Sequence, residues 1–170
     1  MFLLSTTFAS TPPSQEAPDD TLDALWAALS HEPLAGADAA RLREIFHPDA
    51  RVFALRFEDG QPRVVVRSAE EFIARQAEAE KTGFYEREIF RSVRTYGDFA
   101  HALSTVESRT DRDAPQASFV GVNSLQLARE DGRWRILSLY FSQEKPGVPI
   151  PADWRAASFT YPGPAAPALQ

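Results

Sequence analysis

Four ionisable residues on one predicted β-hairpin carry the sharpest chemical signal in this sequence: Glu86, Glu88, Glu107 and Arg109. The hairpin is predicted because two β-rich runs flank Gly97–Asp98, and both residues tolerate the positive φ of a tight turn. A two-residue loop there makes Tyr96 face Phe99. Counting outward from that pair places Glu88 opposite Glu107 and Glu86 opposite Arg109, so all four side chains are expected on one face of the sheet.

Two carboxylates that face each other repel, and the pKa of one of them is then expected to rise toward neutrality. Glu88 or Glu107 is therefore the candidate general acid or base, with Glu86 and Arg109 as candidate ligand-binding residues. The alternative is that Glu86 and Arg109 form a cross-strand ion pair on a solvated or dimer-facing surface, which contributes at most about 1 kcal/mol. The sequence leaves both readings open.

A second hairpin, with strands at 118–129 and 133–143, turns at Asp131–Gly132. Counting outward pairs Asn123 with Tyr140, Leu125 with Ser138 and Arg129 with Trp134. Asn123, Tyr140 and Ser138 then form a polar cluster that fits ligand orientation inside an apolar pocket. The same cluster also fits an exposed face of the sheet.

The histidines give a weaker signal. His47 ends the second predicted helix, where its charged form would interact favourably with the helix dipole; a place at the rim of a pocket is the alternative. Histidines at 31, 47 and 101 lack the spacing of metal ligands, so no metal is predicted. No Gly-rich phosphate loop or dinucleotide fingerprint occurs, so no cofactor is predicted.

Proline and charge define the domain and exclude some partners. Prolines concentrate near both ends, which predicts a domain at 20–145 between irregular arms at 1–19 and 146–170. The net charge of −6 argues against nucleic acid, and no apolar run reaches the roughly 20 residues of a membrane span. Localisation is cytoplasmic if the start is as given. It is periplasmic or secreted if the N-terminal arm is the remnant of a truncated signal peptide.

The expected elements are three helices and six strands. Helices are predicted at 21–31 with Asp20 as N-cap, from Asp38 to Pro48, and from the capping box at Ser68 to about Lys81. Strands at 51–57 and 63–66 precede the third helix, and the two hairpins follow it. This order predicts an α+β fold with helices on one face of the sheet.

The helix exit at 42–50 and the Asp-Gly-Arg-Trp-Arg-Ile run at 131–136 resemble the NTF2-like superfamily, which includes SnoaL-like cyclases, ketosteroid isomerases and scytalone dehydratase. Four short motifs are similar to an uncharacterised bacterial subgroup, often exported: 84–89, 104–109, 123–127 and 149–151. The resemblance implies a cystatin-like cone, with three N-terminal helices against a strongly bent, mainly antiparallel sheet of about six strands. It also implies a pocket at the open end of the cone and homodimers formed through the sheet.

The expected function is therefore binding of a small, partly hydrophobic molecule. One alternative is a SnoaL-like enzyme that uses carboxylate acid/base chemistry of the isomerase, cyclase or dehydratase type. The second alternative is a non-catalytic dimerisation module. The Asp, Tyr and protonated Asp of the isomerases cannot be placed residue by residue, nor can the catalytic set of the dehydratases, so catalysis stays an open question.

Overall fold

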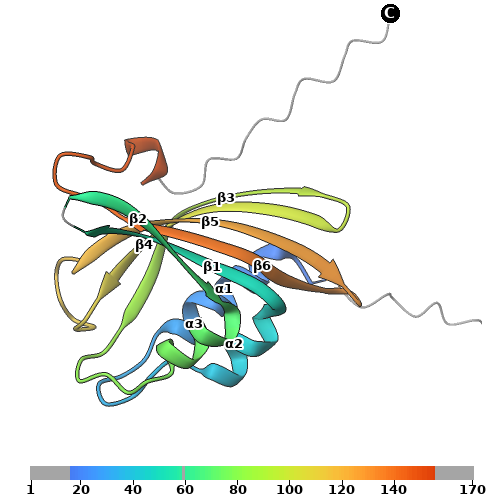
Figure 1. Cartoon of the computed structure of the whole chain (residues 1–170), viewed down its shortest axis with the longest axis horizontal. Helices are drawn as coiled ribbons and strands as arrows, with labels where there is room; N and C mark the ends of the chain where they lie inside the picture. Colours follow the sequence, from blue (N-terminus) through green and yellow to red (C-terminus); the bar gives the residue numbers. More distant parts are fainter. Residues whose placement is uncertain (1–15, 59, 156–170) are drawn as a thin grey trace, which may run out of the picture.

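Three helices and six strands make up most of residues 16–58 and 60–155, which are the residues that the computed structural model describes (Figure 1). In chain order the elements are α1 Pro18–Leu29, α2 Ala39–Ile45, β1 Phe46–Glu58, β2 Gln61–Ser68, α3 Ala69–Gln76, β3 Tyr85–Tyr96, β4 Phe99–Arg109, β5 Phe119–Glu130, β6 Arg133–Gln143 and the 3₁₀ turn η1 Ala152–Trp154. Most of the N-terminal arm predicted at 1–19 lies outside the described residues.

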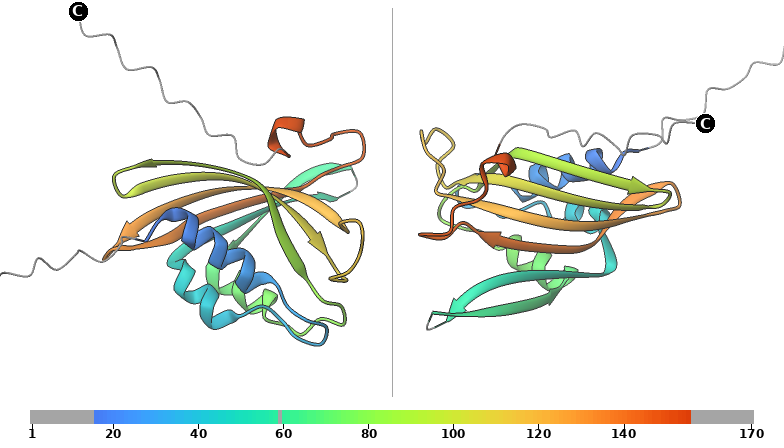
Figure 2. Two further views of the ribbon diagram at one scale, coloured as in Figure 1. Left: turned by 180° about the vertical axis from the view of Figure 1, so that it is seen from behind. Right: turned by 90° about the horizontal axis from the view of Figure 1, so that it is seen from above.

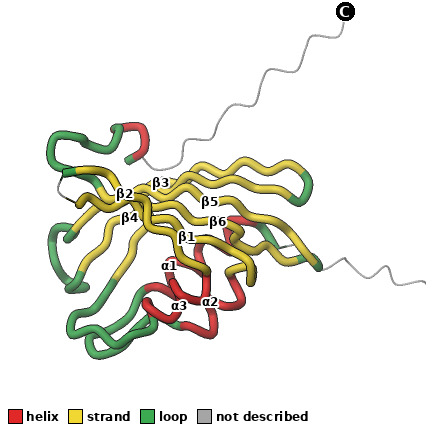
Figure 3. Tube along the Cα trace, in the orientation of Figure 1, coloured by secondary structure: helices red, strands yellow, loops and turns green. Residues whose placement is uncertain are grey.

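The six strands form one mixed sheet in the order β2-β1-β6-β5-β4-β3. Only the β1–β6 pair among them is parallel, which confirms a mainly antiparallel sheet. All three helices cover the same face, as Figures 2 and 3 show. The sheet twists but is not strongly curled, so the strongly bent cone is not confirmed, and α3 follows β2 instead of lying N-terminal to the sheet.

The core lies between the helices and the sheet because α1 presents apolar residues at helical spacing. Leu22, Leu25 and Trp26 are buried and belong to the same cluster as Leu125 and Ile136 of the sheet. None of the described helices is both long enough and apolar enough to cross a lipid bilayer.

The first helix begins three residues before its predicted start. Pro18 occupies its first turn, and the cap residue is Ala17, so the prediction of Asp20 as N-cap is wrong. Asp20 instead reaches back from inside the helix and accepts a hydrogen bond of 2.9 Å from the backbone N–H of Ala17. The predicted helix starts at Asp38 and Ser68 are confirmed, and the side chain of each accepts a hydrogen bond from a backbone N–H in the first turn of its helix.

The first hairpin turns where predicted, and Tyr96 faces Phe99. The pairing of Glu88 with Glu107 and of Glu86 with Arg109 is wrong, because a β-bulge lies between Glu88 and Phe90. Ile89 is an extra residue on β3, and one extra residue moves every side chain beyond it to the other face.

Beyond this bulge each glutamate has a different strand partner from the predicted one. Glu86 pairs with Ser108, Glu88 with Val106, and Arg87 with Glu107. Glu86 and Glu88 therefore lie on the helix-covered face of the sheet, whereas Glu107 and Arg109 lie on the outer face.

The second hairpin repeats this pattern. Its turn and the Arg129–Trp134 pair are confirmed, but a bulge at Leu137 shifts the remaining register by one residue. Asn123 pairs with Phe141 and Leu125 with Leu139, so the predicted pairs Asn123–Tyr140 and Leu125–Ser138 are wrong. Asn123 lies on the helix-covered face, and Tyr140 and Ser138 lie on the outer face.

Candidate functional site

A cavity of about 220 Å³ lies between the helices and the sheet. Its walls come from α1, α3 and the strands β3 to β6, and they are mostly apolar and aromatic. The lining residues are Trp26, Leu29, Phe72, Gln76, Phe84, Glu86, Val106, Phe119, Gly121, Asn123, Leu139, Phe141 and Gln143. An apolar cavity with a few polar groups is typical of small-molecule binding sites.

Glu86 supplies the one carboxyl group among these lining residues. Ser108 Oγ donates a hydrogen bond of 3.0 Å to Glu86 Oε1, while Oε2 is buried with no hydrogen-bond partner among the described residues. Burial disfavours the charged form and raises the pKa of Glu86 to about 7, although the hydrogen bond from Ser108 opposes the shift. At neutral pH this carboxyl can therefore be a donor or an acceptor.

The indole of Trp26 is a second buried polar group on a residue that lines the cavity. Trp26 Nε1, an obligatory donor, makes no hydrogen bond within the described part of the chain. Buried polar groups in proteins are almost always satisfied by protein, water or ligand. These two unsatisfied groups, one on α1 and one on β3, belong to residues that line the cavity and favour a polar molecule there.

The cavity owes part of its depth to Gly121, which lies on β5 and has no side chain. A Cβ built there would meet only one atom within 4 Å, the backbone oxygen of Ser142 at 3.6 Å. Its neighbour on the same face, Asn123, is 5% exposed and brings an amide to the wall. Gln143, the strand partner of Gly121 on β6, also lines the cavity, so backbone and two amide side chains bound it at this point.

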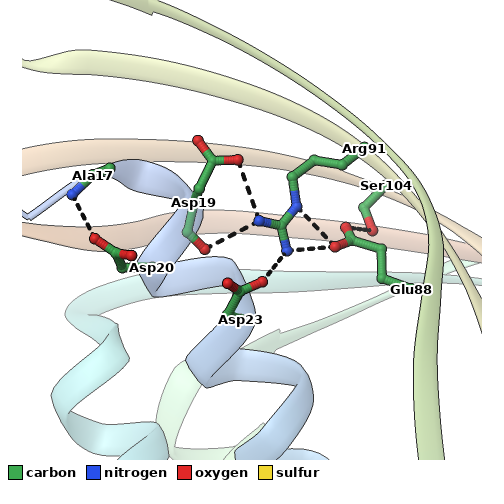
Figure 4. Close-up of polar contacts among 7 residues, drawn as sticks. All are labelled: Ala17, Asp19, Asp20, Asp23, Glu88, Arg91 and Ser104. Atoms are coloured by element: carbon green, nitrogen blue, oxygen red, sulfur yellow. Dashed lines mark hydrogen bonds and ion pairs between the residues drawn. The ribbon is translucent and has the colours of Figure 1, made fainter. Parts of the chain in front are cut away.

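Glu88 lies on the same face as Glu86 but does not line the cavity. Its carboxylate forms an ion pair with Arg91 and accepts a hydrogen bond from Ser104. Arg91 also contacts Asp23 at 2.5 Å and Asp19 at 3.2 Å, as Figure 4 shows. This cluster connects the first turns of α1 to β3, which makes Glu88 part of the packing between helix and sheet.

Glu107 and Arg109 lie together on the outer face. Glu107 accepts hydrogen bonds from Arg87 at 2.6 Å and from Arg109 at 3.0 Å, and these arginines, Arg87 foremost, hold its pKa below the usual range. Arg109 also donates to the backbone oxygen of Ala114. Neither residue lines the cavity between helices and sheet.

The remaining predicted site residues lie elsewhere. Tyr140 and Ser138 line a shallow groove on the outer face, next to His101, and Ser138 donates to Gln126 at 3.1 Å. His47 lies 3.4 Å from Glu130 and accepts a hydrogen bond from the backbone N–H of Asp49. Of the predicted set, only Glu86 and Asn123 line the cavity.

Sequence reasoning missed the aromatic walls of the cavity, chiefly Trp26, Phe84 and Phe119. The apolar spacing of residues 21–31 indicates a buried helix face that includes Trp26, but no local pattern assigns a binding role to Trp26, Phe84 or Phe119. The phenylalanines pack with ring centroids 6.3 Å apart, although they are far apart in the sequence. A correct register of both hairpins would have placed them on the same face as Glu86.

Comparisons with known proteins agree with this architecture. A family model described as "Putative lumazine-binding" matches residues 32–142. No curated protein matches the sequence.

Solved structures share the fold at low sequence identity. An NTF2-like protein of unknown function from Silicibacter pomeroyi is 24% identical, with a TM-score of 0.51, over 75% of this chain and 93% of that one. A protein with a cystatin-like fold from Nostoc punctiforme is 13% identical, with a TM-score of 0.57, over 78% and 91%. A "putative ketosteroid isomerase" from Parabacteroides distasonis is 14% identical, with a TM-score of 0.53, over 81% and 95%.

These structures support the fold alone, while the family match spans the strands and α3 that build the cavity. The chain shares the fold of an NTF2-like protein, and by the match over residues 32–142 it belongs to the family described as "Putative lumazine-binding".

Proposed function

We propose that this domain binds a small, partly hydrophobic molecule in the cavity between its helices and sheet. The observation that carries this proposal is Glu86, a carboxyl group on an apolar wall with one buried oxygen that has no partner among the described residues. Such a group is costly unless something satisfies it, and the name of the family supports a small heterocyclic ligand. The proposed ligand supplies the hydrogen-bond partner that this oxygen of Glu86 lacks.

The shape and chemistry of the cavity restrict that ligand. Its volume of about 220 Å³ is below the roughly 300–1,000 Å³ of pockets for drug-sized ligands, so it suits one or two fused rings. Trp26, Phe84 and Phe119 offer aromatic surface, and Glu86 and Asn123 offer hydrogen bonds. A planar ring system with amide-like groups, as in a lumazine, satisfies both requirements.

A side chain placed at Gly121 is expected to abolish binding. In Gly121→Leu the new side chain occupies the cavity, since only a backbone oxygen stands near the Cβ position. We expect calorimetric titration with lumazine to show binding to the wild type and at least about a tenfold loss in the variant, the equivalent of 1.4 kcal/mol.

Val120→Leu is the control, because Val120 pairs with Glu107 on the outer face of the same strand. It should bind as the wild type does. Binding of lumazine that is unchanged in Gly121→Leu would place the ligand outside this cavity.

An acid/base enzyme is the second candidate, and the pKa of Glu86 favours it. A carboxyl group with a pKa of about 7 can give or take a proton at neutral pH, which is the property a general acid or base requires. Catalysis by Glu88 or Glu107 stays a prediction with less support, since arginines neutralise both. Proton exchange at an acidic carbon of a bound ring compound, lost in Glu86→Gln, would distinguish an enzyme from a binding protein.

The outer face supports a homodimer. Val64 and Val66 of β2 are 59% and 54% exposed there, and Tyr140 is 40% exposed. Exposed apolar surface of this kind favours association with another chain. Light scattering after size exclusion should give twice the 18.9 kDa of one chain, and Val64→Asp should give the monomer.

A wild-type protein that is monomeric at all concentrations would contradict the dimer. A dimer that binds nothing in the cavity would favour the alternative of a dimerisation module.

A further inference from the structure

A second hollow, of about 310 Å³, adjoins the cavity and has the opposite character. The two share the wall residues Phe72, Gln76, Phe84 and Phe141, so they adjoin along these side chains. The cavity described above is termed the inner cavity and this second one the outer hollow. The outer hollow is lined mainly by polar and charged side chains.

Three arginines from three different elements line the outer hollow. Arg56 is on β1, Arg67 is on β2 and Arg75 is in the last turn of α3. Strand pairing places Arg56 and Arg67 on the helix-covered face, because Val52, the partner of Arg67, is buried in the core. The fold therefore gathers three guanidinium groups at one place.

The charge of this hollow is only partly compensated. Its one acidic residue, Glu80, is 3.2 Å from Arg75, which also contacts Glu78 at 2.7 Å. Arg56 and Arg67 make no ion pair with another side chain in the described ranges 16–58 and 60–155, although Arg67 interacts electrostatically with Glu71. The planar guanidinium group recognises carboxylate, sulfate and phosphate through paired hydrogen bonds.

We infer that the ligand is a small organic anion, whose ring lies in the inner cavity and whose acidic group lies among Arg56, Arg67 and Arg75. This inference rests on the proposed function and specifies the class of ligand. Two observations carry it: the hollows adjoin, and two of the arginines at the outer one have no ion-pair partner in the described chain. The apolar inner wall binds the ring, and the arginines select the charge.

A matched pair of probes tests this inference. 2-Naphthoate and 2-naphthamide share a bicyclic ring and a planar substituent but differ in charge. Calorimetric titration at pH 6 and low salt is expected to show about tenfold tighter binding of the naphthoate by the wild type, and added salt should reduce the preference. In Arg56→Gln/Arg67→Gln the preference should disappear, while the affinity for 2-naphthamide should stay the same.

The control is Arg41→Gln/Arg87→Gln, which removes the same charge from residues that line neither hollow. It should keep the preference. Equal binding of both probes by the wild type, or the same loss in both double variants, would overturn the inference and leave the proposed function intact. If correctly folded wild-type protein bound neither probe, the inference would be overturned, whereas failure to bind lumazine would overturn the proposed function.

Discussion

The free energy of unfolding is expected to fall by about 3 kcal/mol between pH 4.5 and pH 7 because of Glu86 alone. In the unfolded chain this carboxyl ionises near its ordinary pKa of 4.5, whereas in the fold its pKa is about 7. The folded state therefore binds the proton more tightly. The resulting stabilisation is complete below the unfolded pKa and is lost as the pH rises through the folded pKa.

Glu86→Gln isolates this effect, since glutamine has a similar shape and no charge in either state. Urea unfolding at half-unit steps from pH 5 to pH 8 should show the wild type losing stability relative to the variant. Carboxyls with a lowered pKa, such as Glu107, change the free energy of unfolding at pH values below this range, and both proteins contain them. Parallel curves for the two proteins would mean that Glu86 titrates normally.

Replacing Arg91 is expected to cause the second large effect. Arg91→Met keeps much of the apolar stem but leaves Glu88, which is 15% exposed, without its cation, and removes the contacts to Asp19 and Asp23. Breaking a buried ion pair by removing one partner costs about 3–5 kcal/mol. The two aspartates are exposed, so we expect a loss near about 3 kcal/mol in the free energy of unfolding.

Arg87→Met provides the matched control on the same strand. Its side chain is 67% exposed and pairs with Glu107 on the outer face, where ion pairs contribute less than about 1 kcal/mol. Urea unfolding of both variants should separate them by about 2 kcal/mol. Similar losses would mean that the cluster around Arg91 does not hold α1 against β3.

The fold was largely predictable from the sequence because its signals are local. Gly97–Asp98 and Asp131–Gly132 mark the two hairpin turns, and the pairs next to them are confirmed. Asp38 and Ser68 mark two helix starts through their capping chemistry. Each of these signals depends on the conformational preference of one or two residues.

The faces of the hairpins could not be predicted, because a β-bulge has no comparable local signature. Ile89 and Leu137 are ordinary strand residues, yet each adds one residue to its strand. The insertion at Leu137 lets Trp134, Ile136 and Leu139 all lie buried on one side of β6, which strict alternation forbids. The bulge forms where it allows the apolar side chains to pack in the core. Its position therefore depends on contacts between residues far apart in the sequence.

The same bulges explain which candidate site residues came together. Glu86 and Asn123 line the cavity, whereas Glu107, Arg109, Ser138 and Tyr140 lie on the outer face. The prediction of an elevated carboxyl pKa was made for facing glutamates that repel. In the fold the raised pKa belongs to Glu86, and its cause is burial.

The central claim is that Glu86 is a buried carboxyl that carries a proton near neutral pH. Carbon-detected NMR titration of the glutamate carboxyls, with Glu86→Gln used to assign the resonance, tests this claim most directly. We expect the Glu86 resonance to titrate with a pKa of about 7. A midpoint near 4.5, the ordinary pKa of a glutamate, would contradict the claim, and with it the chemistry proposed for this cavity.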